Sequence, residues 1–178
     1  MNETPRVDRV GDSDKPVEVV VSDEQTDVVV DTDRWAALAA AVLRSEGRAG
    51  ELTLTFIDVV EMAALNEEYM GKLGPTDVLS FPLDAAADPG SIPAEWGPVL
   101  LGDVVICPVV ATESAPTHAG STDDELALLT VHGVLHVLGH DHAELDEAAV
   151  MRARELELLV EHHWHGPVPT GFTQEQPE

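Results

Sequence analysis

Three histidines close to residue 140 are spaced as ligands of a single metal ion. His132 and His136 lie four residues apart, so a helix would place both imidazoles on one face. Gly139 favours a left-handed turn that ends such a helix, and the reversed chain would return His142 to the same ion. Three imidazoles leave a fourth position for water, as in catalytic sites. Zinc suits neutral imidazoles, although copper or nickel would also bind them. We therefore expect one Zn²⁺ per chain.

The alternative is that these histidines pack in a core or cap a helix. The residues among them are mostly apolar, and unpaired imidazoles are costly in such surroundings, which favours the metal. His140 is the least favoured ligand because of its offset and the geometry of the turn. Asp141 would either orient a ligand or only stabilise the turn. A second group suits the negative end of a later helix better than a second metal: His162, His163 and His165.

The spacing HxxxHxxGxxH also occurs in metzincin proteases, whose glutamate after the first histidine is the general base. Gly133 takes that position here, so the carboxylate that peptide hydrolysis needs is absent. A metal can still activate water and polarise a phosphoryl oxygen, which favours a phosphodiester substrate. A peptidase remains the second hypothesis, with Glu113 or Asp141 as its base. A non-catalytic factor with a structural metal is the third.

Runs of apolar and β-branched residues, or alternation, predict four strands, at residues 17–21, 52–57, 77–82 and 99–107. Helical periodicity and capping patterns predict four helices, at residues 33–46, 59–70, 122–138 and 146–164. Strands interleaved with helices indicate a mixed α/β or α+β fold. The long Ala-, Pro- and Gly-rich connection at 84–98 is either a lid or a surface insertion.

The chain has the length of one domain, which we place at residues 17–166 as the catalytic domain. A disordered leader is expected at 1–16 and a flexible tail at 167–178. No apolar run approaches the roughly 18 residues of a membrane span, and the N-terminus lacks the apolar core of a signal peptide. The single cysteine, Cys107, excludes an internal disulfide and is expected in the core. These features predict a cytoplasmic protein with no membrane association.

The charge is strongly acidic, with 9 basic and 34 acidic residues and a net charge of −25. Such a field repels nucleic acid, so an RNA- or DNA-directed function needs a local basic patch or added Mg²⁺. A solubilising acidic surface is the simpler explanation of the excess.

Beyond the physical argument, the segment HGVLHVLGHDH at 132–142 resembles the HGxLHLxGYDH signature of the YbeY family, zinc-dependent endoribonucleases of bacterial rRNA maturation. Two further stretches agree in order and distance: LNEEYMGK leading into PTDVLSFP at 65–82, and LGDVVI at 101–106. The resemblance covers roughly residues 17–165. It implies an α+β domain with a four-stranded mixed sheet packed against several helices, and a zinc cleft on the histidine helix.

The resemblance also implies a single-strand-directed, metal-dependent endoribonuclease in rRNA processing, including 16S 3′-end maturation, and in ribosome quality control. RNA and components of the small ribosomal subunit would be its partners, and the oligomeric state stays open. With a metal that is only structural, the resemblance would instead imply a non-catalytic ribosome-associated assembly factor. The chain departs from the family at Met70, where an arginine is usual, which leaves Lys72 as the nearest cation. His140 replaces the tyrosine of the signature. Lys72 and the hydroxyls of Thr76 and Ser80 are the candidate substrate contacts, although such hydroxyls also close backbone turns.

Overall fold

The computed structural model describes residues 16–84 and 92–174. Most of the leader expected at 1–16 lies outside these ranges, as do residues 85–91 of the long connection and 175–178 of the expected tail. The division into leader, domain and tail therefore stays a prediction.

Four strands and five α-helices make up the described fold. The strands are β1 (Val17–Asp23), β2 (Gly50–Phe56), β3 (Val78–Pro82) and β4 (Leu100–Ile106). The α-helices are α1 (Thr32–Ser45), α2 (Val59–Met70), α3 (Pro108–Ser114), α4 (Thr122–Val137) and α5 (Leu145–Leu159). Short turns complete them: the 3-10 turns η1 (Ala94–Trp96) and η2 (Ala115–Thr117), and the π-helical turn η3 (Val160–Trp164).

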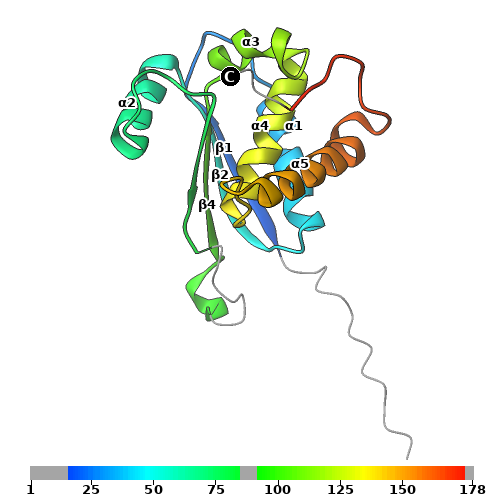
Figure 1. Cartoon of the computed structure of the whole chain (residues 1–178). Helices are drawn as coiled ribbons and strands as arrows, with labels where there is room; N and C mark the ends of the chain where they lie inside the picture. The colour runs from blue at the N-terminus through cyan, green and yellow to red at the C-terminus, as the bar shows by residue number, and fades with distance from the viewer. Residues whose placement is uncertain (1–15, 85–91, 175–178) are drawn as a thin grey trace, which may run out of the picture.

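The strands form one mixed sheet in the order β1-β2-β4-β3, which confirms the expected α+β fold. β1, β2 and β4 run parallel, and β3 runs antiparallel to β4. Figure 1 shows α1, α4 and α5 gathered on one side of the sheet and α2 on the other. No helix in the described ranges is long and apolar enough to cross a membrane.

β4 is buried on both faces, as its nearly continuous apolar sequence predicts. Val104 contributes to the main core between the sheet and helices α1, α4 and α5. Val105 faces the other way and packs with Cys107 and with Met62 of α2 in a smaller core. The cysteine is fully buried, as expected.

Two helical predictions differ from the structure. The helix expected at 146–164 is α-helical only to Leu159 and continues as the π-helical turn η3. The short helix α3 was not predicted, because its seven residues follow a buried strand and carry too little periodicity to stand out.

Helix α4 carries the predicted ligands and lies at the centre of the fold, where the sheet and its neighbouring helices bury most of its length. It packs so closely on β4 that a Cβ added to Gly133 would lie 2.5 Å from Cγ1 of Val104. The position that holds a glutamate in metzincins therefore faces the sheet and has no room for any side chain. Ser80 of β3 strengthens this contact by donating its hydroxyl to the Gly133 carbonyl at 3.1 Å.

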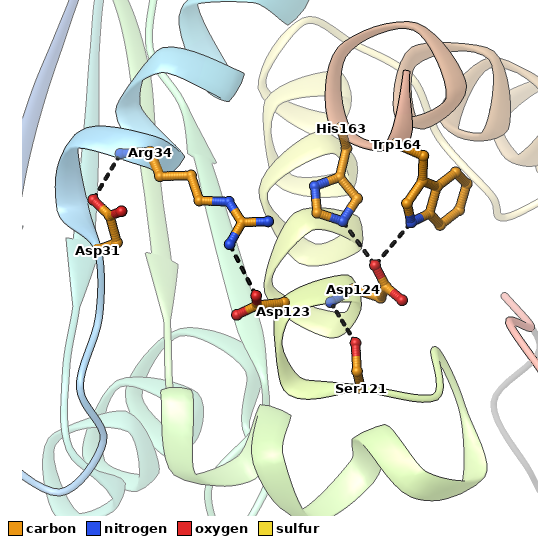
Figure 2. A network of polar contacts seen from close by, with 7 residues as sticks. All are labelled: Asp31, Arg34, Ser121, Asp123, Asp124, His163 and Trp164. Carbon is orange, nitrogen blue, oxygen red and sulfur yellow. Dashed lines mark hydrogen bonds and ion pairs between the residues drawn. The ribbon is translucent and has the colours of Figure 1, made fainter. Parts of the chain in front are cut away.

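The N-terminal turn of α4 is tied to η3 by a polar network (Figure 2). Ser121 caps the helix by accepting the amide of Asp124 at 3.1 Å. Asp124 Oδ1 lies 2.7 Å from Nε2 of His163 and accepts from the indole of Trp164 at 2.8 Å. Burial raises the pKa of Asp124, but the bonds from Trp164, His163 and Ser121 outweigh burial and hold it below its usual value. The network fixes the C-terminal end of α5 relative to α4.

The second histidine group also has structural partners. His163 binds Asp124, and His162 Nε2 lies 2.7 Å from the hydroxyl of Ser45. Within residues 16–84 and 92–174, only His132, His136 and His142 converge closely enough to hold a metal ion. His162 and His163 thus have side-chain partners of their own, and the role of the cluster at the helix end stays a prediction.

Candidate metal centre and cleft

The structure brings the three predicted ligands together. One ring nitrogen from each of His132, His136 and His142 lies within 4.8 Å of the others. The ring centroids are 4.5 Å apart for the first pair, 4.9 Å for His136 and His142, and 5.7 Å for His132 and His142. An ion bound to nitrogens at about 2.0–2.1 Å fits inside a triangle of this size.

The turn after α4 has the geometry that the sequence predicts. Gly139 adopts φ 100°, in the region that favours glycine, and the amide of His140 donates to the carbonyl of Leu135 at 3.0 Å. Asp141 Oδ1 accepts the amides of His142 at 2.7 Å and of Ala143 at 3.3 Å. Of its two proposed roles, Asp141 thus shows the stabilisation of the turn that carries His142.

His140 points to a different partner. Its Nε2 lies 3.6 Å from a carboxylate oxygen of Glu46, which also binds Arg154. This contact agrees with the expectation that His140 is the least favoured ligand of the four.

A buried carboxylate, which the sequence analysis missed, lies behind the first ligand. Glu155 of α5 is 3% exposed, and its Oε1 lies 2.5 Å from Nδ1 of His132. Because a carboxylate only accepts, Nδ1 carries the proton and Nε2 keeps its lone pair for a metal. In the sequence, the burial of Glu155 could have been inferred from its spacing. It lies four residues after Met151 and three before Leu158, on the buried face of the helix. Its partner could not be read from that position.

The chemistry of the triad also fits a metal ion. Burial, followed by the neighbouring His132 and His142, lowers the pKa of His136 to about 4, although Asp141 and Glu155 oppose the shift. His136 is therefore neutral at pH 7, as a metal ligand must be. Among the described residues, the rings of His136 and His142 have no hydrogen-bond partner. Imidazole nitrogens that face one point without a hydrogen-bond partner in the described chain are a suitable donor set for a transition-metal ion.

A cavity of about 580 Å³ lies beside the triad and has His132 and His142 in its wall. Lys72 and Thr76, two of the candidate substrate contacts, line it, and so does Met70. Ser80 is not among the lining residues, since its hydroxyl is bonded to helix α4. Lys72 and Thr76 thus lie where a substrate could meet them, and binding by all three residues stays a prediction.

A second cation in the cleft was missed by sequence reasoning. Arg152 of α5 is exposed and lines the cavity, as Lys72 does. Within the described ranges neither side chain forms an ion pair, whereas Arg34 and Arg154 pair with carboxylates. Two carboxylates, Asp77 and Glu155, line the same cavity, so its wall carries as many basic as acidic residues, in contrast to a chain of net charge −25.

His118 is a further polar residue in the cleft wall. It is buried, and its Nδ1 lies 2.7 Å from Oε1 of Glu125, which is also buried. Its Nε2 is buried with no hydrogen-bond partner among the described residues. Ordered water or a ligand commonly satisfies such a nitrogen in folded proteins.

Comparison with known proteins agrees with this geometry. A family model described as Endoribonuclease YbeY matches residues 20–163, which include the triad and Glu155. The chain belongs to the YbeY family. A relative named Endoribonuclease YbeY from Beutenbergia cavernae is 49% identical over 138 residues, covering 76% of this chain and 91% of the relative. One of the same name from Salinispora tropica is 48% identical, with 74% and 87% covered.

A solved structure shares the fold of this YbeY chain. The solution structure of TM1509 from Thermotoga maritima matches with a TM-score of 0.51 and 20% sequence identity. The match covers 83% of this chain and 91% of that one. At this identity the likeness supports the fold alone. The YbeY match ends at residue 163, so the contacts made by residues 164–174 lie beyond the family model.

Proposed function

We propose that this protein is a zinc-dependent endoribonuclease that cleaves single-stranded RNA during rRNA processing. The observation that carries the proposal is the convergence of three imidazoles beside a cleft whose wall includes Lys72 and Arg152. The relatives named Endoribonuclease YbeY supply the substrate class. Bound zinc would supply a Lewis acid for phosphodiester hydrolysis, held by His132, His136 and His142.

The residues of the chain have separable roles in this proposal. Glu155 holds the ring of His132 with Nε2 directed away from the carboxylate. Lys72 and Arg152 attract the phosphates of the RNA. The arginine that is usual at position 70 could have this role, but this chain has Met70 there. The acidic surface opposes the approach of RNA, so these two cations and Mg²⁺ in solution are needed to offset it.

The family resemblance favours the 3′ end of 16S rRNA as the processed site and components of the small ribosomal subunit as partners. It also favours a role in ribosome quality control, in the cytoplasm. These finer assignments rest on the resemblance.

A peptidase receives no support from the contacts. Gly133 packs against Val104, and the two carboxylates suggested as a base, Glu113 and Asp141, do not line the cleft. The non-catalytic alternative makes a distinct prediction, which is ribosome binding without RNA cleavage.

The test is an RNA cleavage assay with a fluorescently labelled single-stranded oligonucleotide. The wild-type protein should cleave it, a chelator should abolish cleavage, and added Zn²⁺ should restore it. His136→Ala should fall to background, whereas the control His162→Ala, whose ring binds Ser45 outside the cleft, should stay active. Equal cleavage by His136→Ala would identify a contaminating nuclease and overturn the proposal. Ribosome binding by a wild-type protein that cleaves no RNA would favour the non-catalytic factor.

A further inference from the structure

The end of the described chain returns to the metal cleft. Residues 169–174, the C-terminal strap, follow η3 and run back towards α4 and α3, as the red segment of Figure 1 shows. Phe172 packs edge-on against Trp164, with ring centroids 4.8 Å apart. The amide of Thr173 donates to the carbonyl of His118 at 3.0 Å. These contacts bring Gln174 to the wall of the cavity beside the triad.

Gln174 completes the hydrogen bonding of the buried carboxylate. Its Nε2 donates to Oε2 of Glu155 at 2.8 Å and to the carbonyl of Arg152 at 2.9 Å. The other oxygen of Glu155 lies 2.5 Å from Nδ1 of His132. Both oxygens of a carboxylate that is 3% exposed therefore have partners, one on the strap and one on a metal ligand. A buried carboxylate that loses one partner is free to turn or to take up a proton.

We propose that Gln174 is a positioning residue for the metal ligand His132, acting through Glu155. The strap fixes the plane of the carboxylate, and the carboxylate fixes the tautomer and orientation of the imidazole. The inference rests on the metal site of the proposed function. It concerns a segment that the family model does not match, since that match ends at residue 163.

The expected effect follows from the position of Gln174 in the series of contacts. Loss of a group that directly supports a metal ligand weakens metal binding by roughly 10- to 100-fold. Gln174 is one contact further away and is neutral, so its loss should weaken binding by less, about 3- to 10-fold.

The experiment measures the Zn²⁺ dissociation constant by competition with a chromophoric chelator, on the full-length protein. Gln174→Ala should bind Zn²⁺ about 3- to 10-fold more weakly than the wild type. A chain that ends at residue 168 should show the same loss, whereas one that ends at residue 175 keeps Gln174 and should bind as the wild type does. Substitution with Co²⁺ gives a second readout, because its visible spectrum should change in Gln174→Ala if the ligand geometry changes.

A double-mutant cycle separates positioning from a general effect on packing. In a Glu155→Ala background, Gln174→Ala should cause no further loss of Zn²⁺ affinity, because its route to His132 has been removed. Circular dichroism would show whether Glu155→Ala folds. If it does not, the shortened chains and the Co²⁺ spectrum still test whether Gln174 positions His132. Unchanged Zn²⁺ affinity in Gln174→Ala, even with a lower melting temperature, would overturn the inference and leave the metal site standing. A wild-type protein that binds no Zn²⁺ would instead refute the metal site itself.

Discussion

Oε1 of Glu155 lies 2.5 Å from Nδ1 of His132, although 23 residues separate the two in sequence. Replacing this carboxylate with an amide should weaken metal binding, because the charge that strengthens the bond to His132 is lost and the new NH2 group faces either Nδ1 of His132 or the donor of Gln174. We expect Glu155→Gln to raise the Zn²⁺ dissociation constant by about 10- to 100-fold. The matched control is Glu157→Gln, two residues further along α5, whose exposed carboxylate pairs with Arg154. Similar affinities for the two variants would show that the carboxylate does not support the ligand.

Any side chain at position 133 should destabilise the fold. In Gly133→Ala the new Cβ would lie 2.5 Å from Cγ1 of Val104, a β-branched side chain with little freedom to move. The overpacking should cost about 1–3 kcal/mol of unfolding free energy, measured by denaturant titration. Adding Val104→Ala should make the combined loss smaller than the sum of the single losses. Wild-type stability for Gly133→Ala would mean that α4 does not approach the sheet as closely as described.

The sequence predicts the part of the site that depends on local spacing. Helical spacing places His132 and His136 on one face, and Gly139 sets the turn that follows. The position of His142 near them therefore depends only on residues close in sequence. Glu155, Arg152 and Gln174 could not be predicted in the same way. Their positions depend on how α5 crosses α4 and on the path of the strap, which are set by packing between distant segments.

The fold shows the same division. The strands and the longer helices follow from apolar patterning, and β4 is buried on both faces as its composition predicts. From the sequence, Gly133 could be recognised only as a glycine at the position where metzincins have a glutamate. The structure adds the reason, which is that the backbone at Gly133 packs against Val104 and leaves no space for a glutamate side chain. The π-helical turn η3 arises where His163 and Trp164 reach Asp124, an attachment 39 and 40 residues distant in sequence.

Lys72 and Arg152 should contribute to RNA binding through phosphate contacts. Lys72→Ala and Arg152→Ala should each raise KM for a single-stranded RNA with a smaller effect on kcat. Each should also reduce the salt dependence of binding by about one unit of slope. Arg44→Ala is the control, because this exposed arginine on α1 does not line the cleft. An unchanged KM and salt slope in both cleft variants would exclude the phosphate role.

Asp124 should make stability depend on pH in the acid range. Its pKa in the folded state is below the ordinary value of 3.8, so its contribution is present above about pH 3.8 and is lost as pH falls through the folded-state pKa. Asp124→Asn should therefore cost about 1–2 kcal/mol at pH 7 and progressively less as the pH falls below 3.8. Denaturant titrations across this range would measure the difference.

The neighbouring Asp123→Asn is the matched control. Asp123 is 63% exposed and pairs with Arg34 at 2.9 Å, whereas Asp124 is 17% exposed and binds both His163 and Trp164. The exposed pair should contribute at most about 1 kcal/mol at pH 7. A pH-independent difference between Asp124→Asn and the wild type would contradict the charge-based explanation.

The most direct test of the account is the stoichiometry of Zn²⁺ bound to the purified apoprotein, measured by calorimetric titration and elemental analysis. The account predicts one Zn²⁺ per wild-type chain and none for a folded variant that carries His132→Ala, His136→Ala and His142→Ala together. Stoichiometric binding retained by that triple variant, or its absence from the wild type, would contradict the central claim.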